Sequence, residues 1–166
     1  MGLDEFLNQL PEDDDAAINY ASLPELSKLT GPEAEEFGQL WLEWTPERVL
    51  EIVDRMVALC DEQPDVEFEA IYKQGMQHTS TDVRLSALKG LEESSDRALV
   101  KPLTDMLTTD PSVEVRAAAA VPLAYLSAMA QSGKLGVKDE VILTRVLYAV
   151  LEDEREVQTV KLKALE

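Results

Sequence analysis

The 166-residue chain is poor in the side chains that most often carry chemistry, with one cysteine, Cys60, and one histidine, His78. One cysteine cannot form an internal disulfide, and its place in a helical apolar pattern predicts a buried thiol. His78 has no second histidine or cysteine at ligand spacing, so we expect a turn residue and no catalytic role. The sequence also has no glycine-rich phosphate loop and no Gly-x-Ser-x-Gly pattern. It therefore predicts a protein that is not an enzyme and that holds no cofactor and no metal ion.

Aromatic residues are also scarce, at 5% of the chain, whereas alanine, leucine, glutamate and valine are abundant. This composition favours an all-α fold. The start, MGLDEFLNQL, has no basic region followed by an apolar run, so we expect a cytoplasmic location. The longest uncharged run, Ala117 to Ala130, contains Pro122 and is short for a bilayer span, so we expect no membrane partner.

Positive charge is in short supply, with 15 basic against 33 acidic residues and a formal net charge of −18. Residues 1–81 hold 19 acidic and 4 basic residues, and residues 82–166 hold 14 and 11, which gives −15 and −3. Such a field repels phosphate backbones, so we expect no nucleic acid as partner. A basic protein partner fits the charge, and so does a solvated acidic surface. The four acids from Glu12 to Asp15 are interpreted as a solvated loop, since calcium loops alternate their ligands around a glycine.

One phrase recurs along the chain. TDVRLSALKGL begins at Thr81, VEVRAAAAVPL begins at Val113, and an altered copy, QTVKLKALE, begins at Gln158. The basic residues Arg84, Arg116 and Lys161 each follow a valine and are separated by 32 and 45 residues. Periods of this length indicate a helical-repeat protein, in which each helix pair buries its apolar face by stacking on its neighbours.

Helix start and stop signals divide the rest of the chain. Thr45, Pro46 and Glu47 have the pattern of a cap, a first helical residue and an acidic first turn, and the helix that they open is expected to reach Glu62. We expect an irregular N-terminal cap over 1–31 and a single repeat domain over 32–166. Its helix pairs are expected at about 32–62, 66–93, 95–131 and 138–166.

A first helix with a central proline (LVKPLTDML), a turn with an aspartate (TTDPSVEVR) and a second helix that opens Val-Arg resemble the HEAT repeat, in particular its short bacterial, phycobilisome-lyase-like form. The resemblance covers 66–166 well, 32–65 weakly and 1–31 not at all. It implies an α-α superhelix, a HEAT-like solenoid of about three to four helix pairs. It also implies a ladder between Arg84 or Arg116 and turn acids such as Asp82 and Asp110. Lys161 replaces the arginine in the last copy.

The resemblance favours a non-enzymatic scaffold that binds a protein partner on its second helices. Tyr125 and Met129 in the uncharged 117–130 segment, and Trp44 at a helix end, are the candidate contact residues. Either the connection 131–139 covers that segment, or the segment is an apolar binding surface for a partner. The alternatives are a phycobilin lyase-like chromophore-binding or chaperone component and a HEAT-like DNA glycosylase, which the acidic first half opposes. The last repeat has an open edge, which indicates either a fragment of a longer array or a homodimer.

Overall fold

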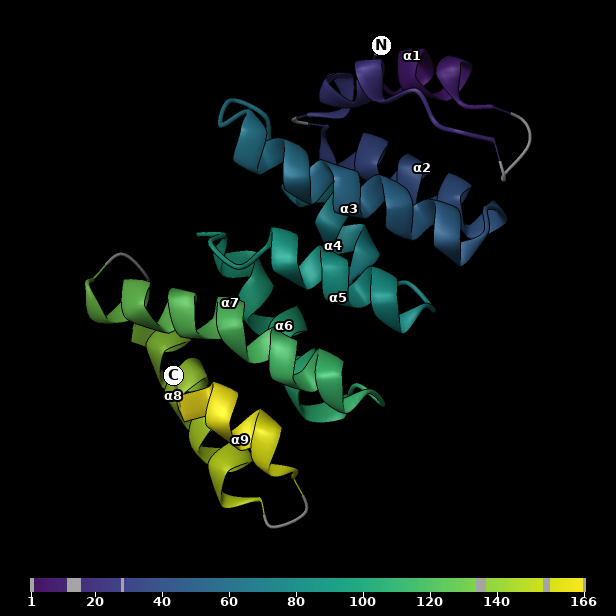
Figure 1. The fold of residues 1–166 in the computed structure, drawn as a ribbon. Helices are drawn as coiled ribbons and strands as arrows, with labels where there is room; N and C mark the ends of the chain where they lie inside the picture. Colours follow the sequence, from purple (N-terminus) through teal and green to yellow (C-terminus); the bar gives the residue numbers. More distant parts are fainter. Residues whose placement is uncertain (1, 12–15, 28, 134–136, 154–155, 166) are drawn as a thin grey trace. The chain divides into compact units, whose positions relative to one another are not determined.

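The computed structural model describes residues 2–11, 16–27, 29–133, 137–153 and 156–165, and all regular structure in these ranges is helical. The all-α prediction is therefore confirmed. The chain divides into two compact units, an N-terminal unit, Met1–Gly90, and a C-terminal unit, Leu91–Glu166 (Figure 1).

The N-terminal unit contains five α-helices and two short 3-10 helices among its described residues. They are α1 (Gly2–Gln9), η1 (Tyr20–Leu26), α2 (Gly31–Leu40), η2 (Trp41–Glu43), α3 (Pro46–Glu62), α4 (Glu69–Gly75) and α5 (Thr81–Gly90). Helices α1 and η1 lie in the 1–31 segment, for which the sequence predicted no regular structure.

The helix starts follow the capping chemistry of the sequence. The Thr45 hydroxyl accepts the Arg48 backbone N–H, and Pro46 occupies the first position of α3. At α2, Thr30 and Glu33 form a capping box, in which the Glu33 carboxylate accepts the Thr30 N–H at 2.9 Å. These local bonds fix where each helix begins.

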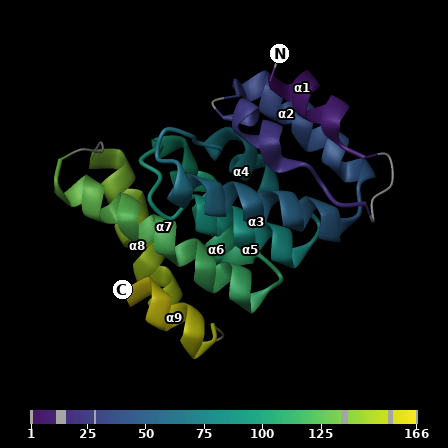
Figure 2. The same ribbon diagram turned by 45° about the horizontal axis from the view of Figure 1, so that its top comes forward.

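Packing in the N-terminal unit pairs alternate helices. Helix α2 packs on α4, α3 packs on α5, and α4 also packs on α5. Helix α1 lies over α2 (Figures 1 and 2), where the Phe6 ring meets the Phe37 ring edge-on at 6.1 Å. The Phe37 ring in turn lies 5.3 Å from the buried Trp41 ring. This aromatic cluster ties α1 to α2 and η2.

Helices α4 and α5 approach each other closely because glycines face bulkier side chains. A Cβ added at Gly75 would lie 2.8 Å from the Ala87 Cβ, and one added at Gly90 would lie 2.5 Å from the Tyr72 ring. Both distances are shorter than van der Waals contact, so these positions accept no side chain without movement of the helices.

The C-terminal unit consists of two helical hairpins. It contains η3 (Arg97–Leu99), α6 (Val100–Thr109), α7 (Val113–Gln131), α8 (Val137–Glu152) and α9 (Gln158–Leu165). Helix α6 packs on α7 and α8 packs on α9, while α7 also packs on α9 and α6 on α8. Pro102, the central proline of LVKPLTDML, lies in the first turn of α6, where its missing N–H is tolerated.

We predict that Gly90→Ala lowers the free energy of unfolding by about 1–3 kcal/mol, because the new methyl group collides with the Tyr72 ring. The helix propensity of alanine opposes this loss only in part. Gly31→Ala is the matched control, since no atom lies within 4 Å of its Cβ position, and it should change stability by less than about 0.5 kcal/mol. Urea unfolding measures both. Equal effects of the two substitutions would contradict the close approach.

Candidate functional site

The arginines of the repeated phrase make the same backbone bond. Arg84 Nη1 donates to the His78 carbonyl at 2.9 Å, and Arg116 Nη1 donates to the Asp110 carbonyl at 2.8 Å. In each case the acceptor lies six residues before the arginine, in the loop that leads into its helix. Arg84 Nη1 also donates to the Thr79 carbonyl at 3.0 Å. The basic residue of the phrase thus fastens the start of its helix to the preceding loop.

Arg116 also connects the two hairpins of the C-terminal unit. Its Nε and Nη2 donate to the two carboxylate oxygens of Glu156, each at 2.9 Å, and both side chains are largely buried. Glu156 lies in the loop before α9, so this bidentate pair joins one second helix to the start of the next. The resemblance implied Asp110 as the acid; Arg116 donates to the Asp110 carbonyl, and its pKa is raised first by the bonds to Glu156 and also by electrostatic attraction from the Asp110 carboxylate.

Asp82 and Lys161, the other residues of the implied ladder, lie near the starts of their helices. Asp82 is exposed in the first turn of α5, and Lys161 is half-buried on α9. Glu156 was not singled out from the sequence. The signal for it was present, because Glu156 precedes Lys161 by five residues much as Asp110 precedes Arg116 by six.

Trp44 lies in an open groove of about 420 Å³ in the N-terminal unit. Its ring is edge-on to Phe37 at 5.8 Å, and the Arg48 guanidinium lies 5.7 Å from the ring centroid. Arg48 Nη2 also donates to the Pro11 carbonyl at 2.7 Å. Leu7, Leu10, Leu40 and the acidic Glu43 complete the lining. Trp44 is half-buried here, so its ring forms a wall of the groove and does not project freely into solvent.

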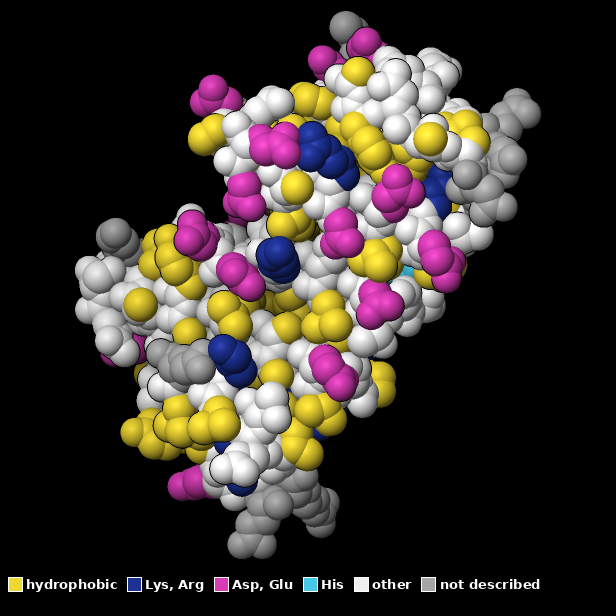
Figure 3. Space-filling model, viewed as in Figure 1, with side chains coloured by type: hydrophobic (Ala, Val, Ile, Leu, Met, Phe, Trp, Pro, Cys, Tyr) yellow, Lys and Arg dark blue, Asp and Glu magenta, His cyan; other side chains and the backbone are white. Residues whose placement is uncertain are grey.

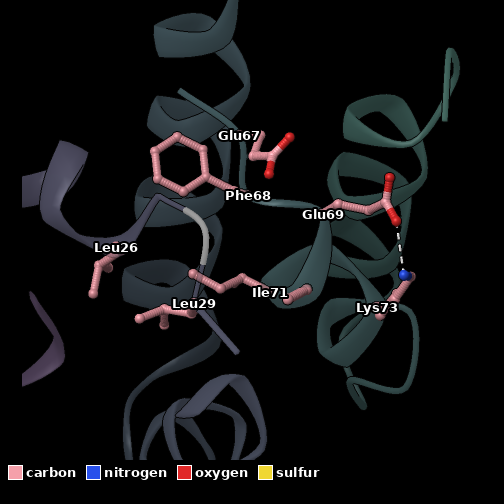
Figure 4. Close-up of a pocket in the computed structure, with 8 residues that line it drawn as sticks. Leu26, Leu29, Glu67, Phe68, Glu69, Ile71 and Lys73 are labelled. Carbon is pink, nitrogen blue, oxygen red and sulfur yellow. Dashed lines mark hydrogen bonds and ion pairs between the residues drawn. The ribbon is translucent and has the colours of Figure 1, made fainter. Parts of the chain in front are cut away.

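A second pocket of about 240 Å³ lies beside the start of α4 (Figure 4). Leu26 and Leu29 line one side of it, and the other side carries Glu69 and Lys73, which form an ion pair at 2.7 Å. Most small-molecule sites enclose about 300–1,000 Å³, so this pocket suits one apolar side chain better than a cofactor.

Helix α7 presents an uncharged stripe outside the core. Ala118, Val121, Tyr125 and Ala128 recur at helical spacing, and none of them is buried. The Tyr125 side chain is 40% exposed, whereas the neighbouring Met129 is half-buried. Tyr125 and Met129, expected from the sequence as contact residues, therefore lie beside each other at the accessible end of α7. Coverage by the connection 131–139 was the alternative, and residues 134–136 of this connection lie outside the described residues.

Helix α7 also has the length and composition of a membrane span. That test is weak on its own, because the buried core helix of a soluble protein passes it as well. Eight residues of α7 are buried within the structure. Glu114 lies in its first turn, and Arg116 follows directly after Val115.

The sole histidine and the sole cysteine both lie in packed surroundings. His78 is buried, with its Nδ1 accepting the Ser80 N–H at 3.1 Å and its ring edge-on to Trp41 at 6.0 Å. Cys60 is half-buried, with its Sγ 3.6 Å from the Tyr72 hydroxyl. Burial, followed by the bond with Cys60, raises the pKa of the Tyr72 phenol well above its ordinary value. These contacts suit structural roles.

Among the described residues, no group of three or more histidine, cysteine or acidic side chains could hold a metal ion. The run of acids from Glu12 to Asp15 lies outside the described residues. Comparisons with protein-family models, with curated proteins and with solved structures found no match to this chain. The candidate sites are therefore defined by their geometry alone.

Titration of His78, the only histidine, tests whether the loop before α5 is buried. Burial, with a smaller contribution from Arg84, lowers the pKa of His78 below its ordinary value of 6.5. Because the folded-state pKa is depressed, the stability that neutral His78 contributes is complete above about pH 6.5 and is lost as the pH falls through the folded-state pKa. We expect its NMR resonance to titrate with a midpoint below that of the urea-unfolded chain. An equal or higher midpoint would show that the ring is solvated.

Acidification should also weaken the pair that joins the two hairpins of the C-terminal unit. The hydrogen bonds from Arg116 hold the pKa of Glu156 below its ordinary value of 4.5, so the stability from this carboxylate is present above pH 4.5 and is lost as the pH falls through the lower pKa. Glu156→Gln should lower the free energy of unfolding at pH 7 by about 1–3 kcal/mol. It should also flatten the loss of stability on acidification. The exposed Glu93, changed to glutamine, is the control in the same urea titrations.

Proposed function

We propose that this protein is a non-enzymatic scaffold that binds a protein partner on the accessible surface of its second helices, in particular α7. The observation that carries the proposal is the uncharged stripe on α7, where Ala118, Val121, Tyr125 and Ala128 are accessible to solvent. A helix of a soluble domain normally presents charged or polar residues at such positions. An accessible apolar stripe on an otherwise charged protein marks a surface for another molecule.

The packing within each unit supports this proposal. In the C-terminal unit α7 packs on α9 and α6 on α8, and in the N-terminal unit α3 packs on α5 and α2 on α4. First helices thus stack on first helices, and second helices on second helices. This is the pairing expected of HEAT-like hairpins, whose second helices line the usual binding surface of a solenoid.

The chemistry of the stripe suggests the form of the contact. Tyr125 supplies a large side chain with few rotatable bonds, and the adjoining Met129 can adapt its shape to a partner. The small alanines along the stripe allow a partner helix to approach closely. A partner with an apolar face therefore fits, and the charge of −18 adds long-range attraction if the rest of that partner is basic.

Affinity capture from the organism that encodes the chain tests the proposal. Immobilised protein should retain a basic protein at low salt and release it as salt rises, because the attraction between the charged surfaces is screened. The double substitution Tyr125→Glu with Met129→Glu should reduce the retained amount at least about tenfold, since it places charge in an apolar contact.

Leu42→Glu is the matched control. Leu42 is an exposed large apolar residue of η2, remote in sequence from the stripe, and its substitution adds one of the same charges. It should leave capture unchanged. Binding at α7 would be refuted if the stripe variant and the Leu42 variant change the captured amount equally. It would also be refuted if the unsubstituted protein retains no partner. Circular dichroism confirms that each variant is folded before it is used.

A further inference from the structure

Exposed apolar side chains are concentrated on the last hairpin. Six of the eight large apolar side chains that are exposed in the described ranges lie in α8, in α9 or just before α9. Figure 3 shows hydrophobic side chains gathered over this hairpin, at the lower left of the view. Tyr148 is 62% exposed, Val141 is 60% exposed and Leu162 is 54% exposed. This surface is separate from the α7 stripe to which the proposed function refers.

Four of the exposed residues of α8 form one continuous stripe. Val141, Arg145, Tyr148 and Glu152 recur at i, i+4, i+7 and i+11, which places them along one line of the helix. Leu143 and Val150 are buried on the opposite side, where α8 packs on its neighbours. On α9, Leu162 likewise lies opposite the buried Val160. Both helices thus turn apolar residues away from the core of their unit.

The charges on the α8 stripe are self-complementary. Arg145 precedes Tyr148 by three residues and Glu152 follows it by four, so one charge of each sign lies on either side of the tyrosine. Both are exposed, and neither has an ion-pair partner among the residues that the structure describes. In an antiparallel pairing of two such helices about a two-fold axis near Tyr148, Arg145 of each copy faces Glu152 of the other.

We propose that the α8 stripe is the interface of a homodimer, in which two copies pair α8 in antiparallel orientation about Tyr148. Two-fold interfaces require that each contact occur twice, and the arrangement of Arg145 and Glu152 meets that requirement. A purely basic partner would meet Arg145 with like charge, whereas a second copy brings the opposite charge to both positions. Val141 and Tyr148 then lose their exposure to water, which supplies the favourable free energy of association.

Sedimentation equilibrium of the whole chain tests the dimer, at concentrations from about 1 to 200 µM to bracket weak and moderate affinities. Salt of about 150 mM is used, because the Debye length of about 8 Å then screens the repulsion between two copies that each carry −18. We expect the mass to rise from that of one chain to that of two. Tyr148→Glu should remove the dimer, and Leu42→Glu should leave it intact.

Charge reversal identifies the pairing. Arg145→Glu places like charges opposite each other twice in the dimer and should weaken association at least about tenfold, and Glu152→Arg should do the same. The double reversal restores opposite signs and should recover most of the affinity. A mass of one chain throughout the range overturns the proposal. A dimer that is insensitive to these substitutions, or one that the double reversal fails to rescue, overturns it as well and indicates another surface.

Discussion

An arginine guanidinium bonded to the loop before its own helix fixes the start of α5 and of α7. Arginine is costly to bury unless its N–H groups find acceptors, and carbonyls in a turn are costly to bury unless they find donors. Arg84 and Arg116 meet both needs through a bond to the carbonyl six residues earlier. The loop conformation and the position of the helix start are therefore fixed together. Arg116 extends the same side chain to Glu156, so one residue organises its own hairpin and the entry to the next.

The sequence was a good guide wherever local chemistry decides the structure. Helix α3 begins at Pro46 and ends at Glu62 as predicted, because Thr45 caps it and Pro64 follows it. The start of α4 was less predictable, because the apolar residues before it suggest a helix from Val66, whereas the first helical residue is Glu69. The close contact of Gly90 with Tyr72 could not be predicted at all, because it depends on how two helices meet in space.

For the candidate surfaces, too, the sequence did not always predict which side of a helix faces the core. The segment DEVILTRVLYAVLED is apolar on several sides, so periodicity alone could not tell that Leu143 faces the core and Tyr148 faces water. The α7 stripe was easier to predict, because a run without any charge is unusual wherever it lies.

The two units differ in charge, with 20 acidic and 6 basic residues in 1–90 and 13 acidic and 9 basic residues in 91–166. The two apolar surfaces thus belong to the less acidic unit, where the approach of a second copy of this acidic chain is least opposed.

The packing around Cys60 makes the N-terminal unit observable without engineering. The thiol lies against the Tyr72 hydroxyl, and the Tyr72 ring fills the space in front of Gly90, so α3, α4 and α5 meet around one aromatic side chain. Cys60 is half-buried and becomes more accessible to a thiol reagent when that contact opens, and the chain has no other cysteine to confuse the signal. The rate of alkylation is therefore expected to rise when this contact opens more often in the native state.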